Sequence, residues 1–200
     1  VVSEADGDGV DLVFVSFSST DSGGVDILIR EGDCAGCDLS GADLSDLDLS
    51  GVDLTNTVLN GVNFKNSQLE GATLSRARGD RASFQGASLR ESKLDSVILR
   101  SSNFQDADLT DATAPTSNFS ASNFQRARLN LIQAPFGIFQ GANLRDAELQ
   151  GASLTRASFV QADLSGASFR QADLSYADLT GADLTGTDFL GANRTGTRYR

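Results

Sequence analysis

A five-residue period runs through this chain and constrains its fold more than any other feature. In the stretch CDLSGADLSDLDLSGVDLT, residues 37–55, leucine recurs at every fifth position. Five is neither the two-residue period of a β-strand nor the 3.6-residue period of an α-helix. From Leu39 to Tyr199, all but five of the 33 positions in this register are leucine or phenylalanine. No insertion breaks the register, so the pattern indicates one repetitive structure.

Each position of the five-residue unit has a physical role. The large residue and the small residue two places before it, most often alanine, point inward because side chains alternate along an extended chain. The residue two places after the large one is often glycine, or asparagine at Asn56 and Asn66, which suits the positive φ at the third position of a type II turn. Four such units of extended piece and turn close a square coil of twenty residues.

The phenylalanines give an independent check on four units per coil. Phe64, Phe84, Phe104 and Phe124 are spaced by twenty residues, and so are the Ala-Pro pairs that contain Pro115 and Pro135. We expect equivalent positions of successive coils to stack. With a spacing of about 4.8 Å between coils, the repeat predicts a rod roughly 40 Å long. At Gly79, where the inward side chain is missing, it predicts either a void or a change in the backbone.

These repeats closely resemble the pentapeptide-repeat family, over about residues 37–199. The resemblance implies an all-β fold, a right-handed quadrilateral β-helix (solenoid) of about eight coils of four pentapeptides. Its handedness is taken from the family and does not follow from the spacing. We therefore expect a non-repeat N-terminal segment and cap over residues 1–36, containing one strand in VDLVFVSFSS at 10–19, and the β-helix over residues 37–200.

Composition excludes several classes of function. The chain has no histidine and only two cysteines, so the usual transition-metal sites cannot be built, and we expect neither a metal nor a cofactor. No apolar run approaches eighteen residues, so we expect no membrane span. Serine, aspartate and arginine are abundant, but the repeat structure already explains why they occur at their positions. A rod whose interior is filled with side chains also offers no pocket for a substrate. We therefore expect that the protein is not an enzyme.

Charge is unevenly distributed along the chain. Residues 1–60 carry 13 acidic side chains and 1 basic one, whereas residues 61–200 carry 14 acidic and 15 basic ones. The only arginine-rich segment, Arg76 to Arg81, is interrupted by Asp80, so we expect no direct binding of nucleic acid. The acidic start provides a candidate acidic surface, made of Asp38, Asp43, Asp46, Asp48 and Asp53.

Cys34 and Cys37 form a C-x-x-C pair that lacks the context of a redox or zinc motif. Two interpretations stay open: both cysteines act as core residues at inward positions, or they form a local disulfide that tightens the first coil and indicates an oxidising compartment. The leader resembles one that precedes the repeats in exported members of the family. That resemblance favours export, to the periplasm or the thylakoid lumen, over the cytoplasm.

A few outward positions carry apolar groups where the repeat is otherwise polar. Phe136, Arg156 and Tyr176 share one column at twenty-residue spacing, and Ile138 lies around the adjacent corner. Single exposed apolar residues are ordinary, but this grouping makes a candidate interaction surface. We expect a non-catalytic scaffold that binds a protein partner, not identified, through a face of the β-helix.

The alternative function comes from the family, some of whose members mimic DNA and modulate DNA gyrase in the manner of quinolone resistance. This chain lacks projecting loops, and its repeat runs to the last residue, which departs from part of that group. A homodimer through one end of the rod is also compatible with the sequence.

Overall fold

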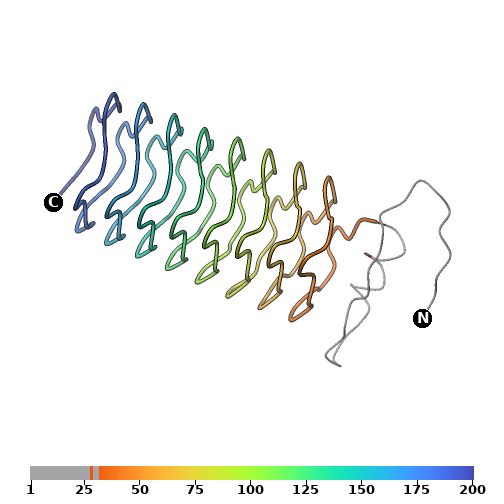
Figure 1. The fold of residues 1–200 in the computed structure, drawn as a ribbon. Helices are drawn as coiled ribbons and strands as arrows, with labels where there is room; N and C mark the ends of the chain where they lie inside the picture. The colour runs from red at the N-terminus through yellow and green to blue at the C-terminus, as the bar shows by residue number, and fades with distance from the viewer. Residues whose placement is uncertain (1–27, 29–31) are drawn as a thin grey trace.

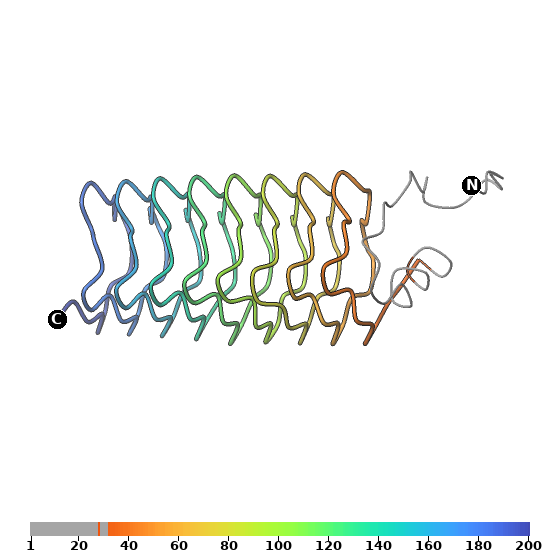
Figure 2. The ribbon, with the colours of Figure 1, turned by 90° about the horizontal axis from the view of Figure 1, so that it is seen from below.

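A computed structural model describes residue 28 and residues 32–200, which wind into a rod of stacked, four-sided coils (Figure 1). Seen from a second direction, the coils follow one another at even spacing along the whole rod (Figure 2). The strand expected at residues 10–19, and most of the cap expected over residues 1–36, lie outside the described residues. No helix in the described part of the chain is long and apolar enough to cross a membrane.

The coils are joined by parallel β-bridges between residues twenty apart. The first joins Asp38 to Val58, the last joins Asp178 to Arg198, and every fifth residue between them takes part. Each bridge is one residue long, and the described residues contain no longer strand. At the first bridge, Leu39 N–H donates to the Val58 carbonyl and Val58 N–H donates to the Cys37 carbonyl, each at 2.8 Å. The bridges confirm the twenty-residue repeat.

Tight turns form the corners between the bridges. At the first, the N–H of Ala42 donates to the carbonyl of Leu39 at 2.9 Å, and Gly41 has a φ of 71°. Every fifth residue from Gly36 to Gly196 has a positive φ, as the type II turn requires at its third position. Many of these residues are not glycine or asparagine, so the regular coil imposes a left-handed conformation that their side chains disfavour.

The core is a column of large side chains with small ones packed beside them. Phe64, Phe84, Phe104 and Phe124 stack in succession, with ring centroids 5.1, 4.7 and 4.6 Å apart. This confirms the stacking that their spacing predicts. Buried hydroxyls at the small positions donate to turn carbonyls; the Thr57 hydroxyl, for example, lies 2.6 Å from the Leu54 oxygen. No buried side-chain nitrogen or oxygen of the described residues lacks a hydrogen-bond partner.

At Gly79 the backbone changes and fills the position that a side chain would occupy. A Cβ built there would lie 2.5 Å from the carbonyl oxygen of Leu59, closer than real Cβ atoms come. The turn that follows is bridged from the next coil: Ser102 Oγ accepts from the N–H of Ala82 at 3.2 Å and donates to the Gly79 carbonyl at 3.4 Å. Of the two expected outcomes, the structure shows the change in the backbone.

Candidate interaction surfaces

The candidate column of Phe136, Arg156 and Tyr176 forms one continuous stack along a corner of the rod. The guanidinium carbon of Arg156 lies 5.6 Å from the centre of the Phe136 ring and 5.8 Å from that of Tyr176. Cations at such distances from an aromatic face are attracted to it. The two rings are 49% and 58% exposed. The stack therefore brings three large side chains together at the surface of the rod.

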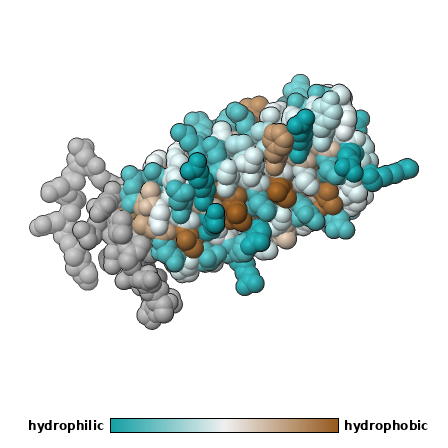
Figure 3. Space-filling model, turned by 180° about the vertical axis from the view of Figure 1, so that it is seen from behind, coloured by the Kyte–Doolittle hydropathy of each residue, from teal (hydrophilic) through white to brown (hydrophobic). Residues whose placement is uncertain are grey.

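The Phe136–Tyr176 column, as we call these three residues, has apolar neighbours on both sides. Ile138 lies on the adjoining face and is 36% exposed. Leu131 lies at the preceding corner, is 51% exposed, and leans over Gly151 in the next coil. Leu131 is an outward apolar residue that is not part of the surface predicted from the sequence; the glycine one coil further on, Gly151, is a signal that could have added it. Elsewhere apolar side chains are scattered over a largely polar surface, as Figure 3 shows for one side of the rod.

The five acidic candidates do not gather on one surface. Asp38, Asp43, Asp48 and Asp53 are five residues apart, so they lie on successive sides of the coil and encircle the rod. Asp46 lies at a corner and accepts a hydrogen bond from the Asn66 side chain at 3.0 Å. Residues 32–60 contain no lysine or arginine, and none of their carboxylates forms an ion pair with the described residues.

Local hydrogen bonds keep most of these carboxylates charged. The backbone N–H of Ser50 donates to Asp48 at 3.0 Å, and the Ser50 hydroxyl donates to the same oxygen at 2.6 Å. The hydroxyl is the larger of the two effects, and together they lower the pKa of Asp48 below its ordinary value. The pKa values of Asp38, Asp43 and Asp53 are lowered in the same way by Ser40, Ser45 and Thr55. The same carboxylates therefore cap turns and carry a ring of negative charge.

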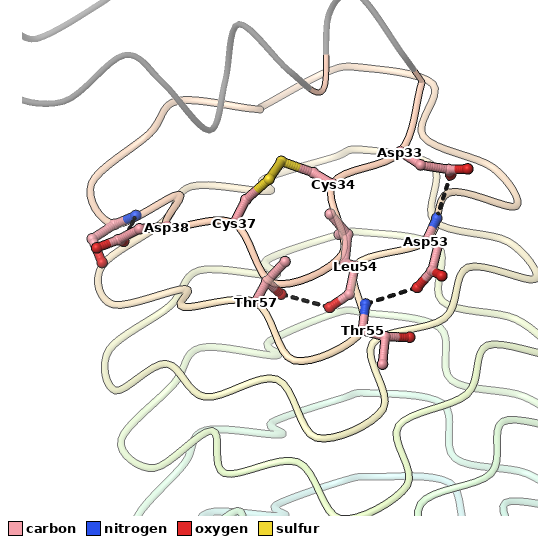
Figure 4. The surroundings of a disulfide bond; sticks show 9 residues. Asp33, Cys34, Cys37, Asp38, Asp53, Leu54, Thr55 and Thr57 are labelled. Atoms are coloured by element: carbon pink, nitrogen blue, oxygen red, sulfur yellow. Dashed lines mark hydrogen bonds between the residues drawn. A yellow bond between two sulfur atoms is a disulfide. The ribbon is translucent and has the colours of Figure 1, made fainter.

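Cys34 and Cys37 are joined by a disulfide bond at the first described coil (Figure 4). Cys34 is buried, and Cys37 packs against the core from a partly buried position. The two residues also close a turn, in which the N–H of Cys37 donates to the carbonyl of Cys34 at 3.1 Å. Beside them the Asp33 carboxylate accepts the backbone N–H of Asp53 at 2.8 Å. The cysteines thus combine the two roles that the sequence left open, core packing and a local cross-link.

The polar side chains of the described residues are arranged for turn capping. No group of three or more histidine, cysteine, aspartate or glutamate side chains within them is placed to hold a metal ion. The serine and threonine hydroxyls near the aspartates are engaged in capping turns, as at Ser45 and Thr110. The geometry on the surface is therefore that of a rigid framework which displays side chains.

Comparison with known proteins shows which family has this repeat. The family model for pentapeptide repeats matches in eight copies, over residues 37–76, 63–100, 80–113, 102–131, 138–175 and 162–198. Comparison with curated protein sequences finds no match.

Several solved structures of pentapeptide-repeat proteins are similar to the chain. HetL, involved in heterocyst differentiation regulation in the cyanobacterium Nostoc sp. strain PCC 7120, is 31% identical, with 83% of this chain and 84% of that one covered and a TM-score of 0.45. A trypsin-treated variant of QnrB1, a plasmid-mediated fluoroquinolone resistance protein, is 21% identical, with 83% and 85% covered and a TM-score of 0.53. A thylakoid lumen protein of Arabidopsis thaliana is 26% identical, with 68% and 67% covered and a TM-score of 0.25.

Members of the matched family form a right-handed quadrilateral β-helix, in agreement with the four-sided coils and parallel bridges seen here. The family model matches well over half of the chain. The chain therefore belongs to the pentapeptide-repeat family.

Proposed function

We propose that the protein is a non-catalytic scaffold that binds a partner protein through the Phe136–Tyr176 column. The observation that carries this proposal is the exposed stack of Arg156 between two aromatic rings. Tyrosine and arginine are the residues that most often dominate the energy of protein interfaces. The contacts of Arg156 with both rings favour the stacked arrangement before a partner binds, which reduces the entropy lost on binding.

The test removes the apolar surface without destabilising the turn. In a double variant, Phe136→Gly with Tyr176→Gly, glycine accepts the positive φ, so we expect the fold to be kept. A partner isolated from extract of the source cells with the unmodified protein, and then purified, should bind the variant at least tenfold more weakly in calorimetric titration. The control, Gln161→Gly with Gln171→Gly, changes two other positive-φ turn positions and should bind normally. Equal affinity of all three proteins would contradict the proposal.

The acidic first coils favour a second function, modulation of DNA gyrase by mimicry of DNA. The ring of carboxylates in residues 32–60 has no basic residue among it. A 40 Å length of duplex carries roughly 24 negative charges, however, and residues 61–200 are close to neutral. Supercoiling by purified gyrase with added protein tests this function. Inhibition at micromolar concentration that is lost in a variant with Asp43, Asp46 and Asp48 changed to asparagine would support it, and no inhibition would remove it.

We also propose that the protein functions in an oxidising compartment, as expected for an exported protein. The support is the disulfide between Cys34 and Cys37, since such bonds are rare in the reducing cytosol. Mass spectrometry of protein isolated from its source cells under acid quench should find the two cysteines bonded. Finding both as free thiols would contradict this placement.

A further inference from the structure

Arginine side chains of this rod follow a simple rule of pairing. Seven of them form ion pairs, and in every case a carboxylate partner lies 18 or 20 residues away in the chain, which places it one coil away on the same side of the rod. These are Arg90, Arg100, Arg126, Arg128, Arg145, Arg170 and Arg198. Two others, Arg156 and Arg194, lie over aromatic rings instead.

Four described arginines have neither an ion pair nor an aromatic ring: Arg200, the last residue of the sequence, and three others that lie together. Arg76, Arg78 and Arg81 are exposed, and none forms an ion pair with the described residues. The positions twenty residues before and after them are all uncharged: Asn56, Val58, Gly61, Ser96, Ile98 and Ser101. None of these arginines therefore has a carboxylate partner at the twenty-residue spacing.

The fold places these three side chains along one edge of one coil. Arg78 projects from the middle of a side, where it bridges to Val58 in the coil before and Ile98 in the coil after. Arg76 and Arg81 occupy the corners at the two ends of that side, with φ values of 62° and 61°. We call these three residues the arginine rung. Arginine is unfavourable at such a φ, as are the bulky residues of the Phe136–Tyr176 column.

Asp80, which interrupts the arginines in the sequence, is neutralised in the structure. Its carboxylate accepts two hydrogen bonds from Arg100 in the next coil, from Nε at 3.0 Å and from Nη2 at 2.8 Å. Asp95, across the Arg76 corner, accepts the Thr113 hydroxyl at 2.8 Å. Within the described residues, the Asp80 carboxylate is thus paired with Arg100 and with none of the three arginines of the rung.

We propose that the arginine rung binds a short acidic segment of a partner polypeptide. Guanidinium groups bind carboxylates through two parallel hydrogen bonds, and residues two apart in an extended peptide present side chains about 6.8 Å apart on one face. Arg78 lies on one side of the coil between the corner residues Arg76 and Arg81, so the three guanidinium groups can meet successive carboxylates of a peptide laid along that side. The half-buried Val58 and Ile98 beside Arg78 can contact apolar atoms of such a peptide, and the flat rod surface suits an extended ligand.

The charges around the rung limit the ligand to a short one. Towards the N-terminal end, residues 32–60 carry only negative charge, and in the coils that follow the rung Arg100, Arg126 and Arg128 are already paired with carboxylates. A long polyanion such as duplex DNA would extend from the rung into the ring of carboxylates. A segment with two or three carboxylates fits within one side of one coil.

The experiment measures binding of a fluorescent ten-residue peptide of alternating glutamate and threonine by anisotropy at low salt. The triple variant Arg76→Gln, Arg78→Gln and Arg81→Gln should bind it at least tenfold more weakly than the unmodified protein. The matched control, Arg126→Gln, Arg145→Gln and Arg170→Gln, changes the net charge equally and should retain binding. The single variant Arg78→Gln leaves both corner residues unchanged and should weaken binding severalfold. It replaces the triple variant in the test if the triple variant does not fold.

Four outcomes would overturn the proposal. These are no saturable binding to the unmodified protein, unchanged binding by the arginine-rung variants, an equal loss in the control, and tighter binding of a ten-nucleotide oligothymidine or of tripolyphosphate than of the peptide. The Phe136–Tyr176 column is intact in every variant. The result is thus independent of whether the function proposed for that column is correct.

Discussion

The aromatic ring of Tyr176 lies directly over Gly196, the residue at the same corner of the next coil. A Cβ built on Gly196 would lie 2.5 Å from the ring, so no other residue fits there while the ring keeps its position. The column of Phe136, Arg156 and Tyr176 therefore continues onto a bare stretch of backbone. Gly196 therefore has two roles: it adopts the positive φ of its own turn, and its lack of a side chain leaves space for the Tyr176 ring.

Replacing Gly196 with alanine should displace Tyr176 from the stack. The control is Gly191→Ala, in the same coil and at the same turn position, with a φ of 73° against 70° and only the Gln171 side chain nearby. Both variants should lose about 1 kcal/mol through the positive φ. Only Gly196→Ala should change the near-ultraviolet circular dichroism of tyrosine and weaken binding of the partner protein. An unchanged tyrosine signal in both would show that Tyr176 is not held against Gly196.

Replacing Gly79 with leucine, the residue that the repeat favours at this position, should destabilise the protein. Substitution by a consensus residue usually stabilises a protein, but here a Cβ would meet the backbone of Leu59 at 2.5 Å, and backbone cannot move aside cheaply. We expect Gly79→Ala to cost about 2–3 kcal/mol and Gly79→Leu to cost no less, measured as a fall in melting temperature. Gly71→Ala, where the Cβ enters open space but φ is 66°, should cost about 1 kcal/mol. A stabilised Gly79→Leu would mean that the backbone returns to the regular coil.

Much of the fold follows from the sequence because inward positions repeat in one fixed register. The spacing of Phe84 and Phe104 was enough to predict that their rings stack. The surface was less predictable, because the spacing of the repeat does not determine which rotamer an outward side chain adopts. That Arg100 would neutralise Asp80, or that Arg156 would lie between two rings, depends on side-chain directions that only the structure provides.

The same limit applies where the sequence left two outcomes open. Gly79 was compatible with a void or with a rearranged backbone, because the repeat specifies the position of a side chain and not the response to its loss. Cys34 and Cys37 occupy inward positions whether or not they are bonded, so the register could not distinguish the two states. The distribution of the aspartates around the rod did follow from their five-residue spacing, but the sequence analysis grouped them as one surface.

The contribution of a core phenylalanine should depend on its position along the rod. Phe104 is fully buried, with rings above and below it at 4.7 and 4.6 Å, whereas Phe189 is partly buried and stacks on Phe169 at 5.5 Å. Phe104→Ala should cost about 3–5 kcal/mol and Phe189→Ala clearly less, because the stability of a solenoid is roughly a sum over neighbouring coils. Hydrogen exchange should show protection lost around the substituted coil. An equal loss of stability in the two variants would contradict this dependence on position.

Stability should fall in acid because the turns are capped by ionised aspartates. Each of these aspartates is followed two residues later by serine or threonine, whose hydroxyl is the largest cause that lowers the pKa; they are Asp38, Asp43, Asp48, Asp53, Asp173, Asp178 and Asp183. A pKa that is lower in the folded protein than in the unfolded chain means that the charged form stabilises the fold. This stabilisation is complete above the unfolded pKa of about 3.9 and is lost as the pH falls through the folded value.

We therefore expect these aspartates to cause no change in melting temperature between pH 5 and pH 7. Below about pH 4 their protonation should lower the melting temperature. Asparagine already accepts the same backbone hydrogen bond at Asn118 and Asn123, so replacing Asp173, Asp178 and Asp183 with asparagine should preserve the fold. The triple variant should lose less stability than the unmodified protein between pH 5 and pH 2, as followed by thermal unfolding in circular dichroism. An identical pH dependence in the two proteins would assign the acid sensitivity to other carboxylates, such as that of Asp106, whose pKa is lowered by its hydrogen bond from Arg126.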